Sequence, residues 1–294
     1  MELVSIILTV YKQEKYIEET ILSVVNQTYN NRELLIWDDS PDNNCRNIID
    51  KYEKNFPNKI HAWHHKKNKW IQDNMDFLIW KISDKSEYIA VLEGDDVFRE
   101  DYLEYKIKTF KEHNVDIIYN DISIINENSN IIKESYLKNK WIKMINWTTD
   151  IDYIIRNGSP YHSRSTLMFK KSLLHKISLR IPNFNPYNII SDYNFFIQTL
   201  YNGTVFWIEE NLVFYREHWK NTSKDTYKLF IDLQKLITYY HNVWIINNKT
   251  KQIVLSRLYT GIFLIFLKKA FDESIPYSLK ELFKQTIKKL KHII

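Results

Sequence analysis

The stretch that most restricts the fold runs from Leu3 to Val10. Six of its eight residues are aliphatic, and they show no helical spacing. A run that is apolar on both faces is typical of a central strand in a parallel sheet that helices cover on each side. The next segment, from Tyr16 to Val25, has paired apolar residues and acids in its first turns, which predicts an amphipathic helix. The chain therefore begins with a predicted strand-then-helix unit.

The same alternation continues as far as residue 113. It predicts a doubly wound, mostly parallel α/β sheet, in which ligands bind at the carboxyl ends of the strands. Strands are predicted at 34–37, 59–63, 88–92, 116–119, 122–125, 163–169 and 204–207. Helices are predicted at 47–52, 73–82, 101–113, 170–177 and 191–201.

Two acidic clusters stand where predicted strands end. Asp38 and Asp39 follow the strand at 34–37, and Glu93, Asp95 and Asp96 follow the strand at 88–92. Because the carboxyl ends of parallel strands meet at one edge of a sheet, we expect both clusters at the ligand-binding edge. Carboxylates are hard oxygen ligands that suit a divalent cation bound to a diphosphate. An acidic turn that holds no ligand is the alternative.

No glycine-rich loop follows the first strand. The segment Thr9 to Lys12 contains no glycine, so a dinucleotide fingerprint or a P-loop is excluded. A sugar-1-phosphate nucleotidyltransferase would need such a loop, and a dehalogenase-type phosphatase would need an Asp at the end of this strand. A non-catalytic glycan-binding or nucleotide-binding protein stays open, because Asp192, at the start of the helix predicted at 191–201, can be a helix cap rather than a catalytic residue.

Composition narrows the class of protein further. The net charge is +5, and the sequence has no known nucleic-acid-binding motif. Cys45 is the only cysteine, which excludes an internal disulfide and agrees with a reducing cytosol. The first residues have no signal-peptide pattern. The longest apolar run, 258–267, is about half of the ~20 residues that a membrane-spanning helix needs. We therefore expect a cytoplasmic protein that does not bind nucleic acid.

The pattern becomes wholly helical from residue 224 onward, which predicts a boundary near Thr222. The last segment, 279–294, alternates apolar residues with lysines. Such an amphipathic basic helix can lie on an anionic membrane surface, which would place the protein at the inner face of the membrane. A solvated helix packed on the domain is the alternative. The histidines at 61, 64 and 65 alternate with apolar residues and are interpreted as ordinary side chains of a strand rather than as metal ligands.

Four segments, in order and at the usual spacing, closely resemble the motifs of the inverting family-2 glycosyltransferases of the GT-A fold. These segments are Val4–Tyr11, Tyr16–Tyr29, Glu33–Ser40 and Tyr88–Asp96. The resemblance implies a Rossmann-like sheet flanked by helices, with a nucleotide-binding half (1–100) and an acceptor half (101–221) in a catalytic domain (1–221). The helical region 222–294 is then a C-terminal appendage.

The activity that the resemblance implies is metal-dependent. The enzyme would move a sugar, with inversion, from a UDP- or dTDP-sugar to a hydroxyl of a glycan or lipid-linked glycan, in bacterial surface polysaccharide biosynthesis. The implied cofactor is Mn²⁺ or Mg²⁺. The sugar, the linkage and the oligomeric state are not indicated by the sequence.

The resemblance also implies residues that bind the nucleotide base. Thr9 and Tyr11 border the base and ribose, and Asp39 accepts a hydrogen bond from a base N–H. Asn68 approaches the base, although the segment Lys67–Trp70 lacks the glycine that many relatives have.

The implied diphosphate and metal site combines the segment Glu93–Asp96 with a later Tyr-Arg-x-His element. Asp95 ligates the cation, and Glu93, which stands in place of an Asp, reaches the ribose or the water shell of the metal. Asp96 is interpreted as shaping the turn. Arg216 contacts the diphosphate, and His218 is a further metal ligand.

The acceptor side is implied by two further segments. Asp192 stands where the family has its general base, and Ser191 replaces the usual Glu before it. Arg164, Ser165 and Thr166 match a stretch that lines the acceptor in relatives.

Overall fold

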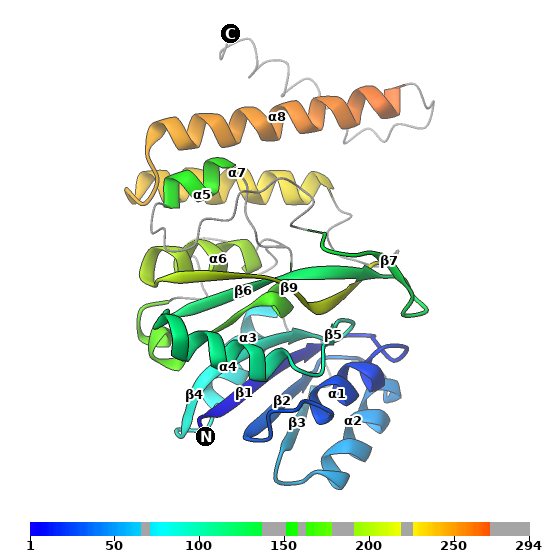
Figure 1. Cartoon of the computed structure of the whole chain (residues 1–294). Coiled ribbons are helices and arrows are strands. Elements are labelled where there is room, and N and C mark those ends of the chain that lie inside the picture. Colours follow the sequence, from blue (N-terminus) through cyan, green and yellow to red (C-terminus); the bar gives the residue numbers. More distant parts are fainter. Residues whose placement is uncertain (66–70, 137–150, 158–162, 178–190, 219–225, 271–294) are drawn as a thin grey trace. The chain divides into compact units, whose positions relative to one another are not determined.

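The structure of the chain is a computed structural model that describes residues 1–65, 71–136, 151–157, 163–177, 191–218 and 226–270 (Figure 1). Its contacts divide the chain into two compact units. The first comprises Met1–Thr149 and Ser159–Asn221, and the second comprises Asp150–Gly158 and Thr222–Ile294. The segment Asp150–Gly158 thus groups with the C-terminal helices, although the sequence placed it within the range 1–221.

The first unit is built on one sheet, in which nine described strands follow the order β3-β2-β1-β4-β8-β6-β9-β5, with β7 paired to β6. The strands β3, β2, β1 and β4 are parallel to one another. β8 is antiparallel to both β4 and β6, and β9 is parallel to β6. This confirms the predicted mostly parallel α/β fold. The strands are β1 (Leu3–Val10), β2 (Arg32–Asp38), β3 (Ile60–His64), β4 (Ser86–Glu93), β5 (Val97–Phe98), β6 (Ile117–Ile125), β7 (Ile131–Lys133), β8 (Met168–Lys170) and β9 (Val205–Arg216).

Helices cover both faces of this sheet, and Figure 1 shows α4 in front of the strands and α3 behind them. Ile6, Ile7 and Leu8 of β1 are all fully buried. Because neighbouring side chains of a strand point to opposite faces, this burial requires cover on both sides. The helices of the first unit are α1 (Ile17–Val25), α2 (Asn44–Asn55), α3 (Ile71–Lys81), α4 (Tyr102–His113), α6 (Ser191–Asn202), and the short 3-10 helices η2 (Arg164–Thr166) and η3 (Lys171–His175).

The prediction of a strand at 163–169 is wrong for the first half of that segment. Ser163 accepts a hydrogen bond at its Oγ from the Ser165 N–H, and the Thr166 hydroxyl donates to the Ser163 carbonyl. These local bonds close the 3-10 turn η2, so the strand begins only at Met168. The runs predicted separately at 116–119 and 122–125 form the single strand β6, which passes a register shift at Asp121.

The second unit contains α5 (Ile151–Asn157), α7 (Thr226–Asn242) and α8 (Asn248–Ala270). Phe230 and Tyr259 are buried against one another, with ring centroids 5.4 Å apart, and so join α7 to α8. α5 is fixed to the turn before α8, because the Asp152 carboxylate accepts a hydrogen bond from the Asn247 N–H. None of the described helices is long and apolar enough to cross a membrane. The predicted amphipathic helix at 279–294 lies outside the described residues.

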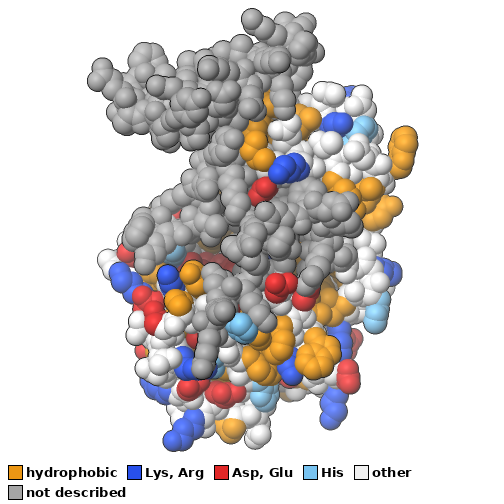
Figure 2. All heavy atoms as spheres, turned by 180° about the vertical axis from the view of Figure 1, so that it is seen from behind, with side chains coloured by type: hydrophobic (Ala, Val, Ile, Leu, Met, Phe, Trp, Pro, Cys, Tyr) orange, Lys and Arg blue, Asp and Glu red, His pale blue; other side chains and the backbone are white. Residues whose placement is uncertain are grey.

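Figure 2 shows one face of the molecule in space-filling form. Acidic, basic and hydrophobic side chains of the described residues are interspersed on it.

Candidate active site

The carboxyl ends of the parallel strands meet at one edge of the sheet. Strand pairing places Thr9 of β1 beside both Trp37 of β2 and Glu93 of β4. Asp38, the last residue of β2, pairs with His64, the last residue of β3. The register thus brings the two acidic clusters to the edge where an α/β sheet binds its ligands.

The loop after β1 packs closely against the turn that follows β4. A Cβ atom added at Gly94 would lie 2.1 Å from Oε1 of Gln13 and 3.2 Å from the Thr9 carbonyl oxygen. The Gln13 side chain could turn away, but the backbone at Thr9 would have to shift. Thr20 of α1 binds the same turn through its hydroxyl, which lies 2.9 Å from the Asp96 carbonyl oxygen. Gly94 therefore lets the loop and the acidic turn approach each other.

The predicted base-binding residues lie along this edge. Thr9 is buried, whereas Tyr11 has 44% of its surface exposed. Asp39 is buried; its N–H donates to the Val10 carbonyl, and its Oδ2 accepts a hydrogen bond of 3.1 Å from Nδ2 of Asn74. Asn74 was not found from the sequence, although a polar residue on an otherwise buried helix face is a usable signal. Asn68 lies outside the described residues.

His64 lies between two carboxylates. Its Nδ1 is 3.0 Å from Oδ2 of Asp38, and its Nε2 is 2.8 Å from Oδ1 of Asp50 in α2. Burial alone would lower the pKa of His64, but the hydrogen bonds and charges of Asp38 and Asp50 outweigh it and raise the pKa above the ordinary 6.5. His64 therefore holds Asp38 at the end of β2. The interpretation of His64 as an ordinary strand side chain missed this contact.

This arrangement predicts a pH-dependent stability. A raised pKa in the folded state means that the stabilisation is fully present below pH 6.5 and is lost as the pH rises through the folded pKa. In the variant His64→Gln the side chain keeps a hydrogen-bonding amide but takes no charge, so we expect the free energy of unfolding to fall less steeply with pH. Urea denaturation between about pH 6 and about pH 9 measures this, with His61→Gln as the control. Equal slopes in wild type and His64→Gln would contradict the prediction.

Asp95 and His218 come together although 123 residues separate them. Oδ2 of Asp95 lies 2.8 Å from Nε2 of His218, and the two side chains are 17% and 9% exposed. Tyr16 stacks on the imidazole of His218 at a centroid distance of 5.3 Å, which fixes the orientation of that ring. The predicted metal ligands are therefore adjacent.

The donor set of this pair fits a cation that is shared with a ligand. A carboxylate oxygen and an imidazole nitrogen suit Mn²⁺. Among the residues that the structure describes, no group of three or more His, Cys, Asp or Glu side chains is placed to hold a metal ion. If Asp95 and His218 held a cation, the remaining coordination positions would be left for phosphate oxygens and water, as is usual for a cation that binds with a nucleotide.

Asp96 is buried and connects the acidic turn to η2 and β9. Its carboxylate accepts hydrogen bonds from the hydroxyls of Ser163 (2.9 Å) and Ser165 (2.6 Å) and from the Arg216 N–H (3.0 Å). Burial and, second, the charge of Asp95 raise the pKa of Asp96. Its role is therefore broader than shaping a turn, because it joins three segments at the site.

The predicted acceptor residues are placed differently from one another. Nε of Arg164 lies 2.5 Å from Oε1 of Glu93, at the site. Ser165 and Thr166 are completely buried. The Ser165 hydroxyl binds Asp96 and also accepts a hydrogen bond from the Glu93 N–H, and the Thr166 hydroxyl donates within η2. This favours a supporting role for both hydroxyls.

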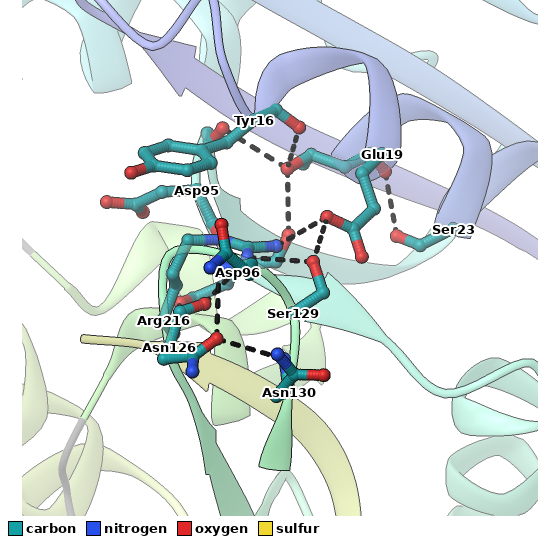
Figure 3. A network of polar contacts seen from close by, with 12 residues as sticks. Tyr16, Glu19, Ser23, Asp95, Asp96, Asn126, Ser129, Asn130 and Arg216 are labelled. Atoms are coloured by element: carbon teal, nitrogen blue, oxygen red, sulfur yellow. Dashed lines mark hydrogen bonds and ion pairs between the residues drawn. The ribbon is translucent and has the colours of Figure 1, made fainter. Parts of the chain in front are cut away.

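Arg216 is also completely buried. Figure 3 shows its side chain among Tyr16, Glu19, Ser129 and Asn126. The guanidinium lies 2.6 Å from Oε2 of Glu19. The contact of Arg216 with a diphosphate stays a prediction.

Asp192 lies in the first turn of α6, and its side chain is not described. Phe195 and Phe196, which follow it by three and four positions, are buried. The helix therefore turns this face toward the core, as the sequence predicts, and the role of Asp192 stays a prediction.

Comparison with known proteins identifies the family of this chain. The profile of the family described as Glycosyl transferase family 2 matches residues 5–178, which is more than half of the chain. An uncharacterised glycosyltransferase of Methanocaldococcus jannaschii is 29% identical over 245 residues, covering 81% of this chain and 77% of the relative. The O-antigen biosynthesis glycosyltransferase WbnJ of Escherichia coli is 26% identical over 229 residues, covering 76% of this chain and 83% of the relative.

A crystal structure of TarS from S. aureus has a similar fold. Its TM-score is 0.68 at 16% sequence identity, and the match covers 97% of this chain and 79% of that chain. At this identity the likeness concerns the fold alone. Taken with the family profile and the strand order, it shows that the chain belongs to glycosyltransferase family 2 and is a glycosyltransferase with the GT-A fold.

Proposed function

We propose that the protein moves a sugar, with inversion, from a UDP- or dTDP-sugar to a hydroxyl of a glycan or lipid-linked glycan, with a divalent cation as cofactor. The observation that carries this proposal is the Asp95 and His218 pair at the strand edge that also holds Thr9 and Asp39. The acidic turn and the proposed base site thus adjoin across β1 and β4, as a nucleoside diphosphate would require.

The names of relatives support the substrate class. WbnJ is described as acting in O-antigen biosynthesis. WfgD of E. coli, 32% identical over 127 residues, is described as a UDP-Glc:alpha-D-GlcNAc-diphosphoundecaprenol beta-1,3-glucosyltransferase. TarS has been solved with UDP-GlcNAc. We therefore propose bacterial surface polysaccharide biosynthesis as the setting.

Asp95 and His218 would hold the cation, and Mn²⁺ or Mg²⁺ are the proposed ions. When bound, the cation would neutralise the charge that develops on the departing diphosphate. PcManGT of Pyrobaculum calidifontis, a fold neighbour at a TM-score of 0.55, has been solved with GDP-Man and Mn²⁺. Arg164 pairs with Glu93 at the same edge, and this ion pair would orient the Glu93 carboxylate toward the ribose.

The transfer itself needs a base. Asp192 would take the proton of the acceptor hydroxyl while the hydroxyl oxygen attacks the anomeric carbon. The new C–O bond forms on the face opposite the diphosphate, and the bond to the diphosphate breaks, which inverts the configuration.

We propose that successive segments of the chain bind the nucleotide and the acceptor. Residues 1–100 would bind the nucleotide, and residues 101–221 would bind the acceptor. The helices of 222–294 would form the appendage, whose amphipathic segment 279–294 would contact the inner face of the membrane.

Nucleotide binding tests the proposal directly. We expect UDP or dTDP to raise the melting temperature only when Mn²⁺ or Mg²⁺ is present, because the cation joins the diphosphate to the acidic turn. At a nucleotide concentration of 100 times Kd the stabilisation is about 2.7 kcal/mol. Thermal denaturation with UDP, dTDP and GDP, each with Mn²⁺ or with EDTA, measures this. A shift of equal size in EDTA would contradict the metal site, and the same shift with GDP would contradict the choice of base.

A further inference from the structure

The Arg216 side chain joins four segments of the first unit (Figure 3). Its backbone N–H donates to Oδ1 of Asp96 (3.0 Å), and its Nε donates to the carbonyl oxygen of Asp95 (2.9 Å). The same residue therefore binds the acidic turn twice, at the backbone carbonyl of Asp95 and at the side-chain carboxylate of Asp96. Because His218 follows only two positions later, these two bonds also fix the distance between the end of β9 and the Asp95 carboxylate.

The far end of the guanidinium is held by a second set of bonds. Nη2 donates to Oε2 of Glu19 (2.6 Å), and Nη1 donates to Oγ of Ser129 (2.9 Å) and to the carbonyl oxygen of Asn126 (3.0 Å). The Ser129 hydroxyl donates to the same Oε2 of Glu19 (2.8 Å). Arg216, Glu19 and Ser129 thus form a closed triangle between β9, α1 and the hairpin that connects β6 to β7.

The hairpin is shaped for this contact. Ser129 has a φ of +62°, which is a left-handed conformation. The Asn126 side chain accepts hydrogen bonds from the N–H groups of Asn128 and Asn130 and so closes the turn around Ser129. The strained backbone at Ser129 thus occurs at the residue whose hydroxyl contacts Arg216.

The charges in this cluster are unequally exposed. The Arg216 side chain is 0% exposed, whereas Glu19 is 43% exposed. A buried guanidinium needs a charged partner, because its desolvation is otherwise uncompensated. Tyr16 covers the guanidinium, with the ring centroid 4.7 Å from Cζ, and stacks on His218 with its ring as well. The arginine and the metal-ligand histidine thus share one aromatic side chain.

From this geometry we propose that Glu19 and Ser129, acting through Arg216, are positioning residues that set the distance between Asp95 and His218 and thereby the affinity for a divalent cation with its nucleotide. The proposal rests on the proposed function, and it assigns Arg216 a task other than direct contact with the diphosphate.

One substitution separates the two tasks of Arg216. In Glu19→Gln the shape of the side chain is kept and its charge is lost. If Arg216 positions the metal ligands, the variant weakens the binding of Mn²⁺ with UDP by about 10–100-fold, as is usual when a residue that orients metal ligands is changed. If Arg216 instead binds the diphosphate, the loss of Glu19 releases the guanidinium, and binding becomes tighter or stays unchanged.

The matched control is Glu18→Gln. Glu18 precedes Glu19 in α1 and pairs with Lys51 of α2 on the exposed surface, at 2.9 Å. Calorimetric titration of wild type, Glu19→Gln and Glu18→Gln with UDP in the presence of Mn²⁺ gives the three Kd values. We expect a weaker Kd only in Glu19→Gln. A Kd equal to or tighter than that of wild type would overturn the proposal.

A double-substitution cycle tests the connection through the arginine. Lysine keeps the charge of Arg216 but loses its planar fork of donors. If Glu19 acts through Arg216, the effects of Glu19→Gln and Arg216→Lys on Kd are not additive, and the double variant is no weaker than Arg216→Lys alone. Full additivity would contradict the proposal.

Failure of the proposed function would look different. Wild type would then bind neither UDP nor dTDP with Mn²⁺. Mn²⁺ alone, titrated by electron paramagnetic resonance, would still compare wild type with Glu19→Gln, and weaker binding in the variant would support the positioning role on its own.

Discussion

We expect the replacement of Asp95 by Asn to remove the Mn²⁺-dependent binding of UDP and to lower turnover by about 10²–10³-fold, the size of effect seen when one charge-stabilising group is lost from an active site. The amide keeps the shape of the side chain and can still hydrogen-bond to His218, but it supplies no negative charge to a cation. Calorimetric titration with UDP and Mn²⁺, together with donor turnover, measures both effects.

The free energy of unfolding should not fall in the same variant. Asp95 and Asp96 are adjacent carboxylates, and the charge of Asp95 disfavours ionisation of Asp96. Removal of that charge relieves a repulsion, so the loss of binding is not a loss of fold. Asp84→Asn is the matched control, since Asp84 is an exposed carboxylate in the loop before β4. Retention of Mn²⁺-dependent UDP binding in Asp95→Asn would rule out Asp95 as a metal ligand.

The strand edge could be predicted because it depends on local patterns. Continuous apolar runs identify the buried parallel strands, and the acids that follow them must then lie at the carboxyl ends. The register confirms this, since Thr9 lies beside both Trp37 and Glu93. A pattern that repeats along the chain is therefore enough to predict which edge of the sheet the acidic residues occupy.

The supporting contacts could not be predicted in this way. Glu19 belongs to an ordinary acidic first turn, and nothing in the sequence connects it to Arg216, which is 197 residues away. The partners of Ser165 and His64 likewise depend on how distant segments pack. A motif shows that an arginine or serine is at the site, but only the packing shows whether its polar atoms face the ligand or the protein.

For the catalytic step, too, the sequence predicts where a residue of α6 lies but not what it does. The sequence places Asp192 on the face of Phe195 and Phe196, and both phenylalanines are buried. An aspartate in the first turn of a helix can be a base or a cap, and the two roles predict different outcomes for one substitution. Asparagine is as good a cap as aspartate, but its amide cannot accept the proton of a hydroxyl.

In Asp192→Asn we therefore expect kcat to fall by about 10²–10⁴-fold, the usual contribution of a general base, while the Kd for UDP with Mn²⁺ stays unchanged. Steady-state transfer to a glycan acceptor and calorimetric titration measure the two quantities. Ser191→Ala is the control: if Ser191 caps the helix, loss of its hydroxyl costs about 1 kcal/mol of stability, and kcat should stay within a few-fold of wild type. Unchanged kcat in Asp192→Asn would assign the residue to the cap. A loss of UDP binding with it would instead show that Asp192 belongs to the donor site, because a base that acts only on the acceptor hydroxyl has no contact with the nucleotide.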